Sequence, residues 1–221
     1  MFDILQYKSI ANVAKENNAT IVAVTKTKPV EDILMAYNND IRDFGENKVQ
    51  ELCAKYECMP KDIRWHMIGH LQSNKIKYIA HFVHLIHGID SYSLLEAVNK
   101  EAAKCNRTIR VLLQVHIARE EKKFGFHSAE LLSLLDSQKY RDLQHIEICG
   151  LMGMATNTSD KEMVKEEFAS LHQLYIYIQK KYFDSNKSFC ILSMGMSGDY
   201  TIALSSGSNM LRIGSILFGH R

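Results

Sequence analysis

The sequence predicts a single (β/α)8 TIM barrel that spans residues 1–221 as one domain. Short apolar segments of strand type alternate eight times with helical segments, and a chain of 221 residues suits one well-buried core rather than two. Only two prolines, Pro29 and Pro60, occur, and no Gly/Ser-rich or densely charged stretch marks a linker. A doubly wound open sheet is the alternative, because sequence shows alternation but not closure, although no GxGxxG motif follows an early strand.

The first half of the chain contains an extra N-terminal helix and four strand–helix pairs. An amphipathic pattern predicts the leading helix over residues 2–17. The run TIVAVT at 20–25 is typical of a buried parallel strand, and Pro29 suits the first turn of the helix after it. Ser91 has the side chain of an N-cap for the fourth helix. The three further pairs have strands expected at 41–45, 64–69 and 82–86 and helices at 47–56, 73–80 and 91–105.

The second half repeats the alternation four more times. The strands are expected at 110–117, 147–152, 189–193 and 210–213. The helices that follow them are expected at 128–136, 161–181, 198–205 and 215–218. Eight strands, each followed by a helix or a helical turn, favour a closed parallel barrel over other α/β folds.

Composition excludes several classes of protein. The net charge of +2 is spread without a dense basic block, so no nucleic-acid partner is predicted. No stretch approaches the roughly 18 consecutive apolar residues of a membrane span, and Asp3 and Lys8 interrupt the N-terminal apolar pattern of a signal peptide. The five cysteines are odd in number and scattered, which fits reduced thiols better than a disulfide framework. We therefore expect a cytoplasmic protein.

The carboxyl ends of barrel strands face the active site, so residues at these ends are the candidates for binding and catalysis. The strand at 20–25 leads into Thr25-Lys26-Thr27-Lys28. Partial burial at the end of so apolar a strand disfavours the ammonium form of Lys26 and makes its amine an imine-forming nucleophile. A solvated lysine at a loop entry is the alternative, and Lys26 by itself would favour that alternative.

The last two strand ends supply a second, independent signal. The seventh strand runs into SMGMSGD at 193–199, and the eighth runs into RIGS at 212–215. Glycines let backbone N–H groups approach an anion closely, and the turns after strands seven and eight of this fold commonly bind phosphate. Two ordinary βα turns are the alternative, since such turns also contain Gly and Ser. Their occurrence at this pair of strands favours phosphate.

These two signals together predict that the chain binds pyridoxal 5'-phosphate. The lysine after the first strand would hold the cofactor as a Schiff base on Lys26, and the turns after the last two strands would bind its phosphate, so that the cofactor lies across the barrel mouth. Arg212 lies just before the second turn, where it can reach the pyridine nitrogen, a position through which proteins tune this cofactor. A salt bridge at the barrel rim is its competing structural role. A different phosphate ligand is a further alternative, which leaves Lys26 unexplained.

Other polar residues have competing structural roles. Asn47 can cap the helix that follows it, and His66 is either a core histidine with a hydrogen-bond partner or a ring-stacking residue. His81, His84 and His87 are spaced by three, but their segment is predicted as strand, where His84 and His87 would face opposite sides. No nearby carboxylate completes a ligand set, so no metal site is predicted.

Seven stretches of the sequence together carry a family resemblance. They are VAVTKTKP (22–29), FGENKVQE (44–51), WHMIGHLQSNK (65–75), KFG (123–125), GLMGM (150–154), LSMGMSGD (192–199) and GSNMLRIGSILFG (207–219). In this order they cover nearly the whole chain, and the chain resembles the YggS/PROSC family of pyridoxal phosphate homeostasis proteins, which are related to the N-terminal barrel of alanine racemase. Thr25 and Asn209 depart conservatively from residues common in the family, a serine and a threonine.

The resemblance implies a monomeric or weakly associating barrel of the alanine racemase N-terminal-domain type, with pyridoxal phosphate on Lys26. It implies that Arg212 lies at the pyridine nitrogen and that the phosphate contacts come from Ser197, Gly198, Gly214 and Ser215. The resemblance implies that Asn47, His66 and Met194 line the pocket. It also implies that Lys28, Asn74 and Lys75 lie at the pocket mouth, where they assist cofactor transfer. Whether Lys28 or Lys75 forms a second Schiff base stays open.

Two functions of different classes are consistent with these residues. The first is a homeostasis protein that stores, buffers or delivers pyridoxal phosphate, with apo forms of other enzymes as partners. The second is an amino-acid racemase, which needs acid/base groups on both faces of the substrate. In alanine racemase a tyrosine from an added domain supplies the second group, and this sequence ends at Arg221 without such a domain. We expect the homeostasis role, with little catalytic turnover.

Overall fold

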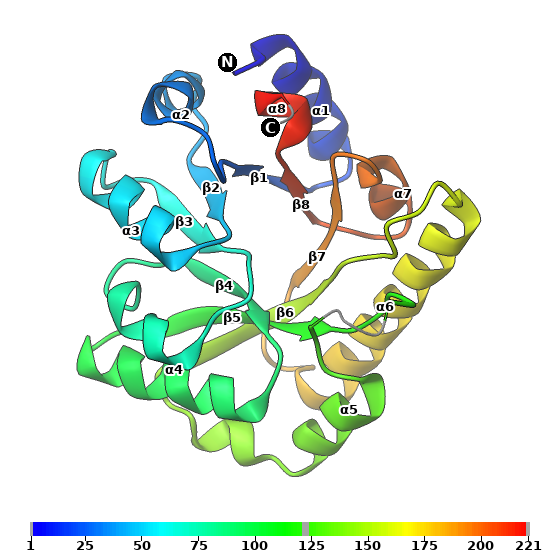
Figure 1. The fold of residues 1–221 in the computed structure, drawn as a ribbon. Helices are drawn as coiled ribbons and strands as arrows, with labels where there is room; N and C mark the ends of the chain where they lie inside the picture. Colours follow the sequence, from blue (N-terminus) through cyan, green and yellow to red (C-terminus); the bar gives the residue numbers. More distant parts are fainter. Residues whose placement is uncertain (1, 121–123, 220–221) are drawn as a thin grey trace.

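Eight parallel strands close into a barrel in chain order, and helices surround it (Figure 1). The computed structural model describes residues 2–120 and 124–219, so Lys123 of the KFG motif lies outside the described residues. The strands are β1 (Thr20–Val24), β2 (Asp43–Glu46), β3 (Arg64–Met67), β4 (Leu85–Ile89), β5 (Ile109–Val115), β6 (Ile146–Gly153), β7 (Ile191–Met196) and β8 (Met210–Ile213). Closure through the pairing of β1 with β8, from Thr20 opposite Met210 to Ala23 opposite Ile213, confirms the predicted barrel.

Helices follow the strands as the alternation predicts. The α-helices are α1 (Ile4–Glu16), α2 (Val30–Tyr37), α3 (Val49–Cys58), α4 (Tyr92–Lys104), α5 (Ser128–Asp136), α6 (Lys161–Tyr182), α7 (Tyr200–Ser205) and α8 (Ser215–Phe218). The described residues also contain two 3-10 helices, η1 (Ser73–Tyr78) and η2 (Lys139–Asp142). Ser91 caps α4 as predicted, because its side chain accepts a hydrogen bond from the N–H of Leu94. The helix expected at 73–80 is the 3-10 helix η1.

The strand expected at 82–86 begins three residues later. The backbone before β4 is still a turn, since the N–H groups of Phe82 and Val83 both donate to the carbonyl of Ile79. His84 therefore precedes the strand, and the expected strand alternation does not apply to it. The rings of His84 and His87 both lie near that of His66, with centroids 5.4 and 5.2 Å away, so the expectation that they face opposite sides is wrong.

Several other boundaries also lie later than expected, three of which affect site residues or strands. The strand expected at 41–45 begins at Asp43, because the N–H of Ile41 still donates to Ala36 at the end of α2. Helix α3 begins at Val49 with Lys48 at its N-cap, so Asn47 does not cap it. Strand β7, expected at 189–193, starts only at Ile191 and runs on to Met196. The residues just before each element, 41–42, 47–48 and 189–190, lie in neither a helix nor a strand.

An apolar cluster inside the barrel leaves the carboxyl ends of the strands as the place for a cavity. Its fully or almost fully buried residues come from six strands: Val22, Leu85, Leu112, Cys149, Met152, Ile191 and Met210. The extra helix α1 packs outside, beside α8 (Figure 1), where the N–H of Asp3 donates to the carbonyl of Leu217 at 2.8 Å. Five free cysteines are present, and no helix in the described parts of the chain is long and apolar enough to cross a membrane.

Candidate functional site

A cavity of about 850 Å³ opens at the carboxyl ends of the strands. Most of the predicted site residues line it: Lys26, Lys28, Asn47, Ser197, Gly198, Arg212, Gly214 and Ser215. The remaining wall is formed by Val24, Thr27, Ile68, Gly69, His70, Gln114, Phe124, Met154, Met196 and Gly219. Segments that are far apart in the sequence thus meet where the fold places ligand sites.

Lys26 lies in a tight turn directly after β1. The N–H of Lys28 donates to the carbonyl of Thr25 at 3.0 Å, which closes the turn around Lys26. Thr27 has a φ of +63°, in the left-handed region that a β-branched residue rarely adopts. Its N–H donates to the Glu51 carboxylate at 2.6 Å, and this bond holds the strained backbone in place.

A buried ion-pair cluster beneath the turn holds it in place. The Lys55 amine, from α3, lies 2.6 Å from carboxylate oxygens of both Glu46 and Glu51 and donates to the carbonyl of Thr25 at 2.7 Å. The Thr25 hydroxyl donates to Glu46 at 2.5 Å. Burial raises the pKa of Glu46, although the hydrogen bonds from Lys55 and Thr25 oppose that rise. Sequence reasoning missed this cluster; its only signal was Glu51 and Lys55 four residues apart on one helix.

The turn after β7 presents backbone N–H groups to the cavity. Gly195 has a φ of +94°, and a Cβ there would lie 2.5 Å from the Cβ of Ala203, so only glycine fits. The turn then closes through the N–H of Met196, which donates to the Asp199 carboxylate. Within the described residues the N–H groups of Ser197 and Gly198 have no hydrogen-bond acceptor. Two unpartnered donors in a cavity wall suit an anion.

The turn after β8 lies beside the turn after β7. The N–H of Gly214 donates to the Ser197 hydroxyl at 3.2 Å, which joins the two turns. Gly214 packs closely on β1, because a Cβ at this position would lie 3.2 Å from that of Val24. Ser215 begins α8, and within the described residues its own N–H has no hydrogen-bond acceptor, whereas those of Leu217 and Phe218 donate to the carbonyl of Gly214.

Arg212 is buried, and three hydrogen bonds hold its guanidinium in place. Its Nη1 donates to the carbonyl and the hydroxyl of Ser193, at 2.9 and 2.6 Å, and its Nη2 donates to the carbonyl of Gly153 at 3.0 Å. Burial lowers the pKa of Arg212 to about 10, so the side chain is still a cation at neutral pH. Two of its five N–H donors are not used in these bonds. Among the described residues no carboxylate forms a salt bridge with Arg212, so the rim salt bridge expected as its competing role is not formed there.

Asn47 lines the cavity directly after β2, and Gly69 lets its backbone approach closely. A Cβ on Gly69 would lie 2.4 Å from the Asn47 carbonyl oxygen. Lys28 also lines the cavity, but its amine donates to the carbonyls of Phe218 and Gly219, at 2.8 and 3.0 Å. The amine is therefore directed toward the end of α8.

Four predicted residues do not line the cavity. His66 and Met194 are buried within the barrel. His66 hydrogen-bonds His87 and Asp43 instead of presenting its ring to the cavity, as the core-histidine alternative expects. Asn74 and Lys75 lie in the 3-10 helix η1, and Lys75 has the ring of Tyr78 as its neighbour.

The structure adds His70, Gln114 and Phe124 to the wall, none of which the sequence singled out. His70 stacks on Phe124, with ring centroids 3.9 Å apart, and its Nδ1 lies 3.1 Å from Asp90. The amide of Gln114 donates to the carbonyl of Phe124 at 2.7 Å. No strand pattern reveals these contacts, because Phe124 comes from a loop and His70 from the segment after β3.

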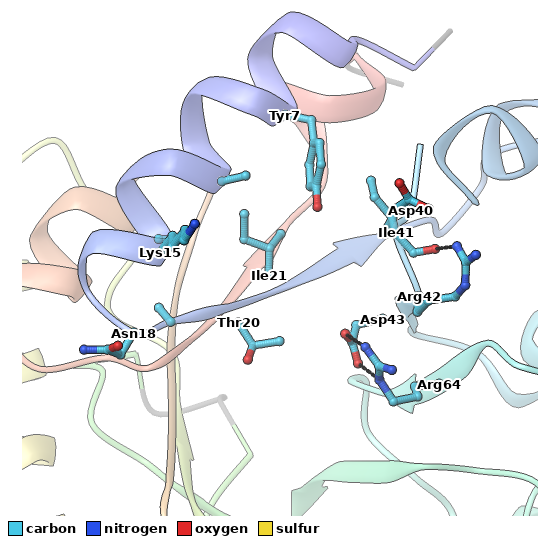
Figure 2. Close-up of a pocket in the computed structure, with 13 residues that line it drawn as sticks. Tyr7, Lys15, Asn18, Thr20, Ile21, Asp40, Ile41, Arg42, Asp43 and Arg64 are labelled. Carbon is cyan, nitrogen blue, oxygen red and sulfur yellow. Dashed lines mark hydrogen bonds and ion pairs between the residues drawn. The ribbon is translucent and has the colours of Figure 1, made fainter. Parts of the chain in front are cut away.

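A second cavity, of about 390 Å³, lies at the opposite, amino-terminal ends of the strands (Figure 2). Tyr7 and Lys15 of α1 line it together with Asp43 and Arg64, the first residues of β2 and β3. Arg64 forms a two-bond ion pair with Asp43, drawn in Figure 2, at 2.7 and 2.5 Å. In residues 2–120 and 124–219 no group of three or more His, Cys, Asp or Glu side chains could hold a metal ion.

Fold and site together define a class: a (β/α)8 barrel whose cavity joins a lysine after β1 to glycine turns after β7 and β8. The family model described as "Alanine racemase, N-terminal domain" matches residues 6–221. This chain belongs to that family, and its curated relatives place it among the pyridoxal phosphate homeostasis proteins, as the resemblance predicted.

Two curated relatives and one solved structure illustrate the similarity. The pyridoxal phosphate homeostasis protein of Aquifex aeolicus (strain VF5) is 37% identical over 207 residues, 93% of this chain and 89% of that protein. That of Synechocystis sp. (strain ATCC 27184 / PCC 6803 / Kazusa) is 38% identical over 206 residues, 91% of each. PipY of Synechococcus elongatus PCC7942, with PLP bound, has a TM-score of 0.85 at 30% identity, covering 97% of this chain and all of PipY.

Proposed function

We propose that residues 1–221 form one domain that binds pyridoxal 5'-phosphate as a Schiff base on Lys26 and acts in intracellular homeostasis of this cofactor. The protein stores, buffers or delivers it. The single observation that carries the proposal is the cavity that brings Lys26 together with Arg212 and the turns at Ser197 and Gly214. PipY, a relative with PLP bound, and the names of the curated relatives support it.

The residues present fit the phosphate end of this cofactor. The unpartnered N–H groups of Ser197 and Gly198 line the cavity, and Ser215 adds a hydroxyl and a first-turn N–H. Gly198 leaves open space, since a Cβ built there meets nothing within 4 Å. Backbone donors and hydroxyls are the groups that commonly hold a phosphate in this part of a barrel.

The residues also fit the ring end. Arg212 lines the cavity and has two N–H donors beyond those that bond Ser193 and Gly153. A cationic guanidinium donates to the pyridine nitrogen and keeps that nitrogen unprotonated, which weakens the ring as an electron sink. This assignment favours a protein that holds the cofactor over one that turns substrates over rapidly.

The first test is covalent trapping on the full chain. The protein, incubated with pyridoxal phosphate, is expected to absorb visible light, and borohydride reduction followed by peptide mass spectrometry is expected to find the cofactor on Lys26. The Lys26→Ala variant is expected to stay colourless. Lys28→Ala is the matched control and is expected to retain the label on Lys26, because the Lys28 amine bonds Phe218 and Gly219. A colourless wild type, or a label on Lys28, would contradict the proposal.

A racemase is the second candidate, and His70 is the observation that favours it. Besides Lys26, Lys28 and Arg212, His70 is the titratable side chain among the described wall residues, and Asp90 orients it. An assay of racemisation across amino acids decides between the two functions. Turnover that both Lys26→Ala and His70→Gln abolish would establish the racemase, whereas the homeostasis proposal expects no robust turnover from the wild type.

The proposal extends to location and partners. We propose a cytoplasmic monomer whose partners are pyridoxal phosphate and apo forms of enzymes that depend on it. Sedimentation of the purified chain tests the monomer. Delivery is tested by mixing the loaded protein with an apo-enzyme that depends on pyridoxal phosphate and measuring the recovery of that enzyme's activity.

A further inference from the structure

A continuous row of hydrogen bonds crosses the barrel interior from one cavity to the other. Asp43 of β2 contacts His66 of β3 at 3.1 Å, and His66 contacts His87 of β4 at 2.9 Å. His87 contacts the hydroxyl of Ser193 on β7 at 3.2 Å, and Ser193 contacts Arg212 of β8 at 2.6 Å. The two ends differ in surroundings, because Asp43 lines the amino-terminal cavity and Arg212 lines the site cavity (Figure 2 shows the Asp43 end).

All five residues are buried, none above 9% exposed. They share the barrel interior with the apolar cluster of Val22, Leu85 and Met210. A hydrogen bond in such surroundings is stronger than one in water, and an unmade one costs more, so each link is expected to stay formed. The row thus joins two groups that an apolar barrel core would otherwise isolate.

The chemistry of the two end groups sets one donor-to-acceptor direction along the whole row of hydrogen bonds. The Asp43 carboxylate only accepts, so Nε2 of a neutral His66 carries the proton and its Nδ1 accepts from Nε2 of His87. At the other end the Arg212 guanidinium only donates, so the Ser193 hydroxyl is free to donate to Nδ1 of His87. Every link then holds one proton, and all donors point toward Asp43.

Burial supports neutral imidazoles in this row. It lowers the pKa of His66, which the bond to Asp43 opposes in part, and it lowers that of His87 well below the ordinary value. The other groups that act on the pair include His84, 5.4 Å from His66 between ring centroids, and Arg110, whose Nη1 lies 3.2 Å from His84. The arginines at the two ends of the row also lower these pKa values, Arg64 that of His66 and Arg212 that of His87. Arg110 lowers the pKa of both His66 and His84, so it too disfavours a charged pair.

We propose that Asp43, His66, His87 and Ser193 form a directional relay of positioning residues that fixes the guanidinium of Arg212 against the pyridine ring of the bound cofactor. The relay acts through Arg212 and touches neither cofactor nor substrate. This inference rests on the proposed function, since it concerns the ring end of the same cavity. Its direction, however, is a property of the protein alone and can be measured without a ligand.

The first experiment therefore uses the unloaded full chain. In protein labelled with ¹⁵N at histidine, two-bond couplings report which ring nitrogen carries a proton. At neutral pH both His66 and His87 are expected to be neutral and protonated at Nε2. In the Ser193→Ala variant the resonance of Nδ1 of His87 is expected to shift, because its donor is gone. A proton on Nδ1 of either ring, or a charged pair, would overturn the relay whether or not the protein binds pyridoxal phosphate.

The second experiment measures the loaded protein. Ser193→Ala removes one of the bonds to Arg212 and is expected to raise the Kd for pyridoxal phosphate about fivefold to tenfold and to move its visible absorbance maximum. Ser193→Thr keeps the hydroxyl and is expected to restore both. Ser208→Ala is the matched control, because Ser208 is a buried serine just before β8 whose hydroxyl donates to the carbonyl of Met194. Equal effects of Ser193→Ala and Ser208→Ala would overturn the proposal; a wild type that never binds the cofactor would instead overturn the proposed function.

Discussion

At the scale of single residues, the placement of Lys26 depends on side chains that lie behind the cavity wall. Lys55 and Glu46 are buried and do not line the cavity, yet Lys55 bonds the carbonyl of Thr25 and Glu46 bonds its hydroxyl. Removing one member of a buried ion pair leaves the other charge without compensation, which costs far more than the pair contributes. The cluster therefore couples stability to the position of Lys26.

Lys55→Met tests this coupling. The change keeps most of the side-chain volume but leaves Glu46 and Glu51 without their cation, so the free energy of unfolding is expected to fall by about 3 to 5 kcal/mol. Urea denaturation measures it. Lys104→Met is the control, because Lys104 pairs with Glu101 at an exposed helix surface, where the loss is expected to be at most about 0.5 kcal/mol. Equal losses in the two variants would show that the buried cluster is not what stabilises the turn.

At the scale of elements, the ends of the strands matter more than their lengths. Strand β7 passes the end expected from its apolar pattern, and its last residues turn at Gly195 to present Ser197 and Gly198 to the cavity. Strands β1 and β8 are hydrogen-bonded along four residue pairs, so Lys26 and Gly214 leave the barrel side by side. The site is thus built by the pairing of the first strand with the last.

Gly195→Ala tests the bend at the end of β7. A Cβ on this residue would lie 2.5 Å from Ala203, at a φ of +94°, so the variant is expected to lose about 1 to 3 kcal/mol of stability and most of its affinity for pyridoxal phosphate. Gly198→Ala, where a Cβ meets nothing within 4 Å, is expected to leave the stability nearly unchanged. Thermal denaturation compares the two, and a stable Gly195→Ala variant would rule out the steric requirement.

At the scale of the whole molecule, the sequence predicts the features that follow from hydrophobic periodicity and from the residues at strand ends. It does not predict contacts between side chains of different strands and helices. The alternation of apolar runs predicts eight strands and the place of Lys26, and the turns beginning at Ser193 and Arg212 predict the opposite wall of the cavity. It does not predict that Lys55 reaches back to the end of β1, nor that His66 and His87 meet, because such pairs join residues whose separation no local pattern encodes. His66 is an example. Its place in a strand is consistent both with a core histidine and with a residue that stacks on a ring in the cavity, and only its hydrogen bonds to Asp43 and His87 show that it is a core histidine.

The buried histidines predict how the stability of the whole protein depends on pH. Burial lowers the pKa values of His66 and His87, and that of His84 to about 4, below the 6.5 of an exposed imidazole. Between the lowered pKa and about 6.5 the unfolded chain binds more protons than the folded one, so stability falls as the pH drops, by up to about 1.4 kcal/mol per pH unit for each such proton. The hydrogen bonds of Asp43 to Arg64 and His66 outweigh the opposing effect of its burial and hold its pKa well below the usual range, so its contribution is lost only at lower pH.

Urea unfolding of the wild type is therefore expected to show full stability above about pH 7 and a steady loss from about pH 6.5 down to pH 5. In His87→Gln the amide can donate to His66 and accept from Ser193 without titrating, so the slope is expected to decrease by about one proton. His81→Gln, at an exposed position outside the barrel, is the control variant. A wild-type stability that is level between pH 7 and pH 5 would mean that the interior imidazoles take up protons in the folded barrel, which the directional row from Arg212 to Asp43 forbids.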